Sequence, residues 1–189
     1  WRTAEAVRFA EQSLELTRSM QHPGHPEIVR SLYVRSLGHS AMGNVAAAVA
    51  EYEEAEEITR AEFGPDSMLN SWPIYAREVA MSAQWKFQEA AEAIRARTEL
   101  YKNKLGPAHP YVGVAACNLA EVQLYLGSVD EAATLIQTCD ATLKSTVGVE
   151  HISHATVIGL RAELHKFKGE REEAEKHFKT ALSIDPSHQ

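Results

Sequence analysis

The strongest constraint on the fold is a repeat of 42 residues that runs through the whole chain. Alanine recurs at this spacing five times, and two series of glycines follow the same spacing. The positions are Ala6, Ala48, Ala90, Ala132 and Ala174; Gly43, Gly127 and Gly169; and Gly64, Gly106 and Gly148. The series that contains Gly43 has one exception, since Trp85 replaces glycine at that position. A fixed period of this length is typical of repeat proteins, in which each unit packs on its neighbours.

Each repeat contains two helical patterns joined by a short link. The first, GVAACNLAEVQLYLG (Gly113–Gly127), has apolar residues at helical spacing and ends at glycine, a common helix terminator. The second, VDEAATLIQTCDATLK (Val129–Lys144), begins with acidic residues that suit a helix N-terminus. The short link makes the two helices antiparallel. The recurrent alanine lies early in the second helix, where we expect close helix packing, and extra methylenes in such a contact cost about 1–3 kcal/mol.

The sequence therefore predicts an all-α solenoid of antiparallel helix pairs, with about nine helices in a single array over residues 1–189. A half repeat is expected at about 3–20, followed by repeats at about 25–62, 70–104, 112–146 and 153–185. The half repeat and a first residue other than Met are expected of a fragment of a longer chain.

The loops between repeats follow the same period. LGPAHPYV (Leu105–Val112) is typical of them, and the register carries His25, His109 and His151, with Ser67 as the exception. Glycine permits positive φ after a helix, and proline is tolerated in the first turn of the next one. We interpret these loops as structural hinges that hold no phosphate site or active site.

Composition narrows the classes of function. The net charge of −7 disfavours non-specific binding to nucleic acid. No apolar run approaches the ~20 residues of a membrane span. Two cysteines, Cys117 and Cys139, are too few for a disulfide framework, and we expect both to be free and buried. A disulfide or a reactive thiol is the open alternative. Free cysteines fit a reducing, intracellular compartment, which we expect to be the cytoplasm.

Two stretches carry a resemblance to a known family. NLA…LYLGSVDEA (Asn118–Ala132) and EEAEKHFKTALSIDP (Glu172–Pro186) resemble the tetratricopeptide repeat, and the loop LGPxHP is similar to the 42-residue variant of kinesin light chains. The resemblance implies a right-handed superhelix whose first helices line a concave groove that binds a peptide or a partner helix. It implies no catalysis.

The chain departs from the family pattern at several positions. Arg35, Arg77 and Arg161 share a register where the family usually has Leu, and Glu78 stands where it has a small residue. Pro73 lies near the start of its first helix, so we expect that helix to begin later than its counterparts.

Candidate partner-binding residues lie on the first helices. We predict that six of them share one concave surface: Arg30, Tyr33, Trp72, Tyr75, Asn118 and Lys166. Tyr and Trp often anchor interfaces, but aromatic residues at helical spacing can equally belong to the core. The first helices carry more basic than acidic residues, so an acidic segment of a partner is one option; the alternative is that these charges only solvate the surface. A chaperone-type carboxylate clamp is not expected, because only Asn118 fits one.

Catalytic and metal-binding motifs are not evident. No Gly-rich phosphate loop, HExxH or nucleophile elbow is present. The pairs His22/His25 and His151/His154 lack a third ligand, and we expect no metal and no cofactor. The leading function is a non-enzymatic protein-interaction module or scaffold. The alternatives are a regulatory or sensor segment that packs in cis on a catalytic or DNA-binding domain, and a permanent subunit or assembly factor of a large complex. The oligomeric state is open.

Overall fold

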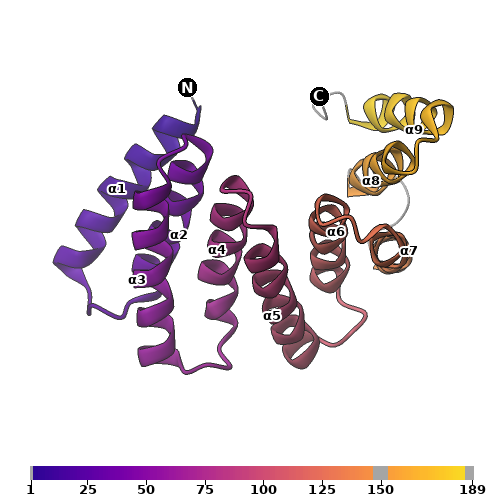
Figure 1. Ribbon diagram of the computed structural model, residues 1–189. Helices are drawn as coiled ribbons and strands as arrows, with labels where there is room; N and C mark the ends of the chain where they lie inside the picture. The colour runs from indigo at the N-terminus through magenta and orange to yellow at the C-terminus, as the bar shows by residue number, and fades with distance from the viewer. Residues whose placement is uncertain (1, 147–152, 186–189) are drawn as a thin grey trace. The chain divides into compact units, whose positions relative to one another are not determined.

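The computed structural model describes residues 2–146 and 153–185, and every regular element within them is helical (Figure 1). The nine α-helices of this part of the chain are α1 (Arg2–Met20), α2 (Pro26–Ala41), α3 (Val45–Phe63), α4 (Ser71–Ala83), α5 (Phe87–Leu105), α6 (Pro110–Tyr125), α7 (Val129–Thr146), α8 (Ser153–Phe167) and α9 (Arg171–Ile184). A short 3-10 helix, Met68–Asn70, precedes α4. Gly148, His151 and Pro186, which the sequence analysis used, lie outside the described residues.

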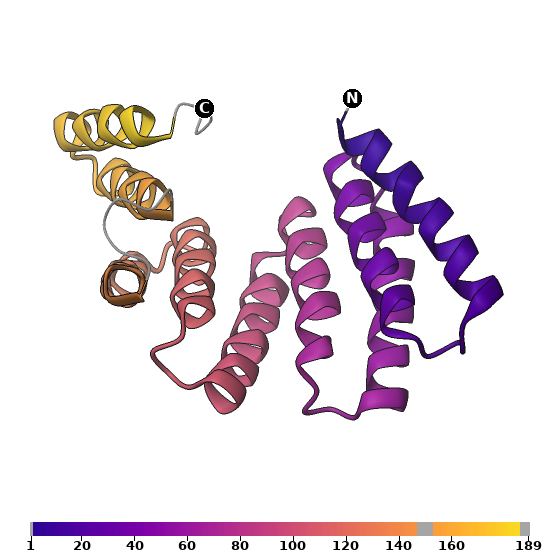
Figure 2. The same cartoon turned by 180° about the vertical axis from the view of Figure 1, so that it is seen from behind.

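The helices form two compact units, residues 1–100 and residues 101–189. In unit 1, α2 contacts α1, α3 and α4; in unit 2, α6 and α8 contact each other, and each packs on the helix that follows it. Figures 1 and 2 show the paired helices running in opposite directions. Each unit has its own core. Leu14, Ile28, Val29, Leu32 and Ala55 form a buried cluster in unit 1, and Leu124, Ala132, Ile136, Leu143 and Val157 belong to one in unit 2.

The recurrent alanines show where the helix pairs are tightest. Ala48, Ala90, Ala132 and Ala174 are all buried. Ala6 of α1 is exposed, and the described residues include no helix packed on it as a first helix packs on the other four alanines. The same residue type at the same register therefore has a packing role only where a partner helix is present.

The residues at the His25 register cap the first helices. The Nδ1 atom of His25 accepts the backbone N–H of Glu27, and the Nδ1 atom of His109 accepts that of Tyr111. Ser67 replaces the imidazole with its hydroxyl oxygen, which accepts the N–H of Leu69. Capping satisfies a helix N–H that would otherwise lack a partner, so the exception at Ser67 keeps the function of the register.

The first helix of the second pair begins late, as Pro73 predicted. The repeat spacing would start it at Met68, but α4 begins at Ser71 and the 3-10 helix covers the preceding turn. The turn between α4 and α5 is also unusual. Gly43, Gly127 and Gly169 occupy the equivalent turns with φ between 75° and 78°, whereas Trp85 adopts φ 61° there.

Candidate protein-binding surfaces

Three of the predicted groove residues form an aromatic cluster on α2 and α4 of unit 1. The ring of Tyr33 stacks on that of Trp72 at 6.2 Å between centroids, and it lies 6.3 Å from the ring of Tyr75. All three side chains are half-buried. Trp72 also packs against the buried cluster that includes Leu32. The cluster thus joins the core on one side and leaves part of each ring accessible on the other.

A buried ion pair supports this cluster from α5. The guanidinium of Arg97 lies 4.7 Å from the centre of the Tyr75 ring, in a cation–π contact. Its NH2 and Nε groups donate to one carboxylate oxygen of Glu78, at 2.6 and 3.1 Å. Both charged side chains are almost fully buried. The buried Glu78, which departs from the family pattern, is therefore compensated by its pairing with Arg97. At the position of Arg97, the other second helices have the uncharged residues Ala55, Cys139 and Ala181.

The fourth predicted groove residue in unit 1 is an exposed cation. Arg30 is one helical turn before Tyr33 on α2, so the two side chains lie on the same face. The guanidinium of Arg30 is 3.4 Å from the carboxylate of Glu27. Such an exposed pair contributes little to stability, about 0–1 kcal/mol, and leaves the cation accessible to a partner.

The other two predicted groove residues belong to unit 2. Asn118 is half-buried on α6, and Lys166 is exposed on α8, where its ammonium group contacts Glu163 at 2.9 Å. The placement of all six residues on one concave surface stays a prediction.

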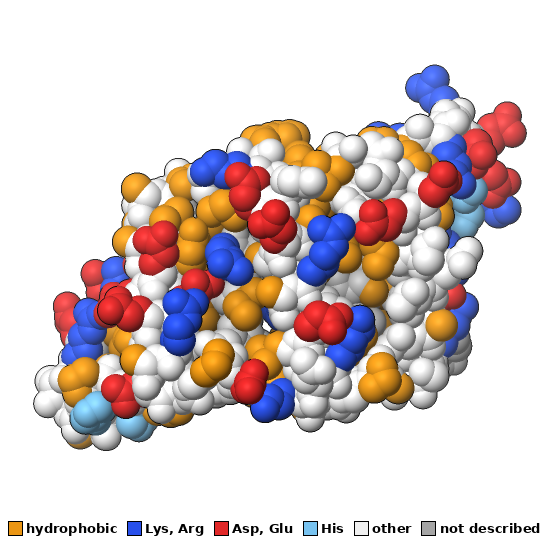
Figure 3. Space-filling model, turned by 60° about the horizontal axis from the view of Figure 1, so that its bottom comes forward, with side chains coloured by type: hydrophobic (Ala, Val, Ile, Leu, Met, Phe, Trp, Pro, Cys, Tyr) orange, Lys and Arg blue, Asp and Glu red, His pale blue; other side chains and the backbone are white. Residues whose placement is uncertain are grey.

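Basic residues of the first helices pair with acidic residues of the second helices. Arg35 contacts Glu51 at 2.8 Å, Arg77 contacts Glu56 at 3.5 Å, and Arg161 contacts Asp140 at 2.7 Å. Some of the basic residues of the first helices are therefore paired within the fold, where they join neighbouring helices. On the face seen in Figure 3, acidic and basic side chains are interspersed with hydrophobic ones, and neither sign of charge dominates.

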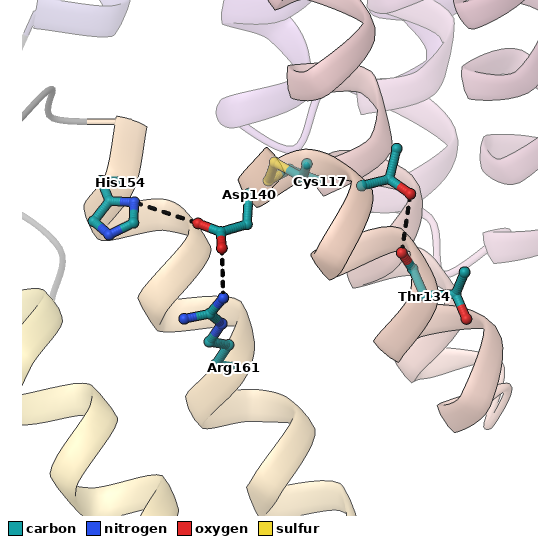
Figure 4. Close-up of a disulfide and its surroundings, with 7 residues drawn as sticks. Cys117, Thr134, Asp140, His154 and Arg161 are labelled. Carbon is teal, nitrogen blue, oxygen red and sulfur yellow. Dashed lines mark hydrogen bonds and ion pairs between the residues drawn. A yellow bond between two sulfur atoms is a disulfide. The ribbon is translucent and has the colours of Figure 1, made fainter. Parts of the chain in front are cut away.

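The two most buried carboxylates in these contacts have opposite pKa shifts. Burial raises the pKa of Glu51 above its ordinary value, although the charges of Arg35 and His39 oppose the shift. Burial also acts to raise the pKa of Asp140, but the hydrogen bond from Lys144 and the charge of Arg161 outweigh it and lower that pKa. Figure 4 shows Asp140 between Arg161 and His154 of α8.

The cysteines differ from the sequence prediction. Cys117 of α6 and Cys139 of α7 form a disulfide with a Cα–Cα distance of 5.4 Å, so the expectation of two free thiols is wrong for this structure. Both residues are buried and lie in the core of unit 2. Two such residues on facing antiparallel helices lie within disulfide range. The register places Tyr75 and Arg97 at the same two positions one repeat earlier, and the structure shows that these two residues also contact each other.

Unit 2 contains an apolar cavity of about 360 Å³ between two first helices and a second helix, which the sequence did not predict. Its lining comes from α6, α8 and α9, and comprises Glu121, Leu124, Tyr125, Thr156, Gly159, Leu160, Glu163, Phe167 and Phe178. Gly159 occupies the register that holds Tyr33 and Tyr75 in unit 1. A small residue there leaves room that an aromatic ring would fill.

The histidine pairs have structural roles where they are described. The Nδ1 atom of His22 accepts the N–H of Gly24, next to the helix cap made by His25. His154 lies 3.6 Å from the carboxylate of Asp140. Among residues 2–146 and 153–185, no group of three or more His, Cys, Asp or Glu side chains has an arrangement that could hold a metal ion.

Within the described part of the chain, no helix combines the length and the apolar character required to span a membrane.

Comparisons with known proteins agree with this architecture. A family profile described as tetratricopeptide repeat matches residues 155–188. A crystal structure of nearly identical TPR-like repeats from a putative kinesin light chain of Podosopora anserina is similar, with a TM-score of 0.71 and 23% identity. The similarity covers 99% of this chain and 89% of that one. A variant of that protein gives a TM-score of 0.73 at 23% identity, over 98% of this chain and 87% of that chain.

A third solved structure gives the same result. The crystal structure of BtubC (BKLC) from P. vanneervenii matches with a TM-score of 0.79 and 17% identity, over 99% of this chain and 75% of that chain. A comparison with curated protein sequences found no match. The predicted fold class, an all-α solenoid of antiparallel helix pairs, is confirmed.

Proposed function

We propose that this chain binds a segment of a protein partner on its first helices. The proposal is supported by the match of residues 155–188 to a tetratricopeptide-repeat profile and by the fold, which is that of the kinesin light chain repeats. Stacked helical repeats of this kind form extended binding surfaces. The observation that carries the proposal is the contact of Tyr33, Trp72 and Tyr75 across α2 and α4. Half-buried Tyr and Trp rings that are held in place lose little conformational entropy on binding, which favours them as anchors.

The chemistry of this surface indicates the kind of segment it binds. The aromatic rings favour a peptide or helix with an apolar or aromatic side chain at its centre. Arg30 provides a cation one turn away on the same helix face, so an acidic residue beside the apolar anchor fits best. Asn118 and Lys166, on first helices of unit 2, are proposed as further contacts for a longer segment.

Catalysis forms no part of the proposed function. The aromatic surface brings together rings and paired charges, which suit binding. A cytoplasmic location also belongs to this proposal. In that compartment the Cys117–Cys139 pair is expected to be reduced.

The test is affinity capture with this chain as bait at low and high salt, repeated with single substitutions. Tyr33→Ala and Arg30→Ala are expected to reduce retention of the specific partner, with a loss of at least tenfold in affinity for Tyr33→Ala once a peptide is titrated. Tyr111→Ala and Arg60→Ala are matched controls, since both residues are exposed and lie outside the cluster. High salt is expected to weaken the complex in the wild type more than in Arg30→Ala.

Two outcomes would contradict this assignment. Equal retention by Tyr33→Ala and Tyr111→Ala would exclude the aromatic cluster as the binding site. A large fall in Tm for Tyr75→Ala, with unchanged partner binding, would place the cluster in the core.

A further inference from the structure

Unit 2 repeats the helices of unit 1 at a later place in the chain. The helices α6, α7 and α9 each begin two periods of 42 residues after α2, α3 and α5. Every residue that lines the cavity between α6, α8 and α9 therefore has a counterpart on α2, α4 or α5. The side chains of unit 1 show which groups the repeat places at the equivalent positions.

Two aromatic rings of unit 1 are missing from unit 2. Trp72 and Tyr75 of α4 lie 6.2 and 6.3 Å from the ring of Tyr33 on α2, measured between centroids. Their counterparts on α8 are Thr156 and Gly159, and both of these residues line the cavity. A small residue in place of a large one leaves a void unless the surrounding structure closes in. The cavity therefore lies where unit 1 has these two rings.

The third ring of the aromatic cluster has no equivalent in unit 2 either. Tyr33 corresponds to Cys117, which forms the disulfide with Cys139 of α7. Cys117 does not belong to the lining of the cavity. The space that the cluster fills in unit 1 is thus left without a ring in unit 2.

The walls of this cavity are aromatic and apolar. Tyr125 and Phe167, at the C-terminal ends of α6 and α8, meet edge to face with 6.3 Å between their centroids. The buried Leu124 and Leu160, together with Phe178 of α9, also line it. Such walls offer water few hydrogen-bond partners, so an apolar group that displaces water from them gains free energy. A volume of about 360 Å³ is near the lower end of the range for ligand pockets and suits a small ligand.

The two charged residues of the lining already have partners. Glu163 contacts the ammonium group of Lys166 at 2.9 Å, and Glu121 also interacts with another group. We therefore assign their charges no role in recognition. A charged ligand would lose its hydration beside the apolar walls, and this loss costs free energy. An uncharged ligand fits the cavity best.

We propose that this cavity binds a small, uncharged molecule with one aromatic ring. The ring takes the place that the rings of Trp72 and Tyr75 take in unit 1, between aromatic walls that unit 2 supplies. Two sources have this chemistry, a free molecule and an aromatic side chain of another polypeptide, and the experiment below separates them. The site shares no residue with the aromatic cluster on α2 and α4 that carries the proposed function.

Isothermal titration calorimetry of the whole chain with p-cresol and with benzyl alcohol tests the proposal. Both compounds are expected to bind with 1:1 stoichiometry and a Kd on the order of 0.1–1 mM, as suits ligands of this size. Benzoate is expected to bind at least about tenfold more weakly than p-cresol, because its carboxylate has to be desolvated. Cyclohexanol has a similar size but no aromatic ring, and we expect its Kd to be about fivefold higher, since it lacks edge-to-face contacts with the walls.

Two substitutions put back the side chains of unit 1 and locate the site. Gly159→Tyr and Thr156→Trp each place a ring in the cavity, and each is expected to weaken p-cresol binding at least about tenfold. Thr138→Trp is the matched control, because Thr138 is exposed on α7 outside the lining, and its Kd should stay within about twofold of the wild-type value. Thr156 is exposed, so Thr156→Trp keeps the test decisive if circular dichroism shows that Gly159→Tyr fails to fold.

A capped Gly-Tyr-Gly peptide distinguishes the two sources of the ring. A Kd within about tenfold of that of p-cresol would identify a side chain of another polypeptide as the ligand. A higher Kd would identify a free molecule, because the peptide backbone then has no room at the cavity. Either result supports an aromatic ring as the group that the cavity binds.

Three results would overturn the proposal. The first is no binding of p-cresol at concentrations up to about 10 mM, and the second is an equal Kd for p-cresol and cyclohexanol. The third is p-cresol binding that both Gly159→Tyr and Thr156→Trp leave unchanged. Tyr33→Ala should bind p-cresol as the wild type does, although it loses the protein partner, so failure of this proposal is distinguishable from failure of the proposed function.

Discussion

Pairs of residues 22 positions apart occupy equivalent places in the four complete helix pairs. They are Tyr33 and Ala55, Tyr75 and Arg97, Cys117 and Cys139, and Gly159 and Ala181. Tyr75 and Arg97 form a cation–π contact, and the two cysteines form a disulfide. In the pair with the smallest side chains, Gly159 lines the cavity. One place in the repeat therefore supports very different chemistry, because each pair has to fill only the space between its own two helices.

Asp140 gives a residue-scale prediction about pH. Its pKa is lower in the folded protein than its ordinary value, so the folded state binds fewer protons at this site than the unfolded state does. The carboxylate therefore stabilises the fold at pH values above about 4, and the contribution is lost as the pH falls through the folded-state pKa. Asp140→Asn is expected to lower the free energy of unfolding by about 1.5–3 kcal/mol at pH 7, and by much less at about pH 2.5.

Urea denaturation of both proteins at the two pH values measures this difference. Asp130→Asn, an exposed carboxylate on the same helix, is the control and should change stability by less than about 1 kcal/mol. A loss for Asp140→Asn that is the same at both pH values would show that the amide changes packing and that the charge of Asp140 has no role.

The partners of the arginines were within reach of the sequence but needed the repeat register to be found. Arg77 and Arg161 lie two repeats apart, and so do their partners Glu56 and Asp140. At the intervening positions both residues are uncharged, Leu119 and Thr98. A count of charges per helix predicts an overall preference for an acidic partner, but it cannot tell which of those charges are already paired. The half-buried state of Tyr33 and Trp72 could not be predicted from the sequence either. Helical spacing indicates which face of a helix a side chain lies on, but not how much of that side chain is exposed.

At the scale of helices, the period was the most informative signal. It identified the antiparallel pairs and the alanines of the tight contacts, whereas the late start of α4 was predicted from Pro73. It succeeds because a packing requirement that recurs in every repeat leaves a recurring residue type. The cavity was not predicted, since it depends on one departure from the register, Gly159, together with the positions of rings on three helices.

A pair of equivalent alanines tests whether packing explains the register. Ala132 is fully buried on α7, and Ala6 is exposed at the same position of α1. Ala132→Leu is expected to lower the free energy of unfolding by about 1–3 kcal/mol, because the added methylenes have no space between the helices. Ala6→Leu adds the same atoms in solvent and should change stability by less than about 0.5 kcal/mol. Equal effects of the two substitutions in urea denaturation would mean that alanine recurs for helix propensity instead.

At the scale of the whole chain, a single disulfide distinguishes the two compact units. Cys117 and Cys139 both lie in residues 101–189, and the bond closes a loop with a sequence separation of 22. The tryptophans have the opposite distribution. All three, at positions 1, 72 and 85, belong to residues 1–100. Tryptophan emission therefore reports on unit 1 alone, whereas far-UV circular dichroism reports on the helices of both units.

Reduction should destabilise unit 2 without affecting unit 1. Loss of a cross-link of this span is expected to lower the free energy of unfolding by about 3 kcal/mol, mainly because the unfolded chain gains freedom. With dithiothreitol, the dichroism transition in urea should gain an earlier phase, while the midpoint of tryptophan emission stays in place. The double variant Cys117→Ala with Cys139→Ala should not respond to dithiothreitol. If emission and dichroism shift together, coupling between neighbouring repeats makes the chain unfold as one body. If the wild type does not respond, the cysteines are not bonded in solution, and the expectation of free thiols in a reducing compartment returns.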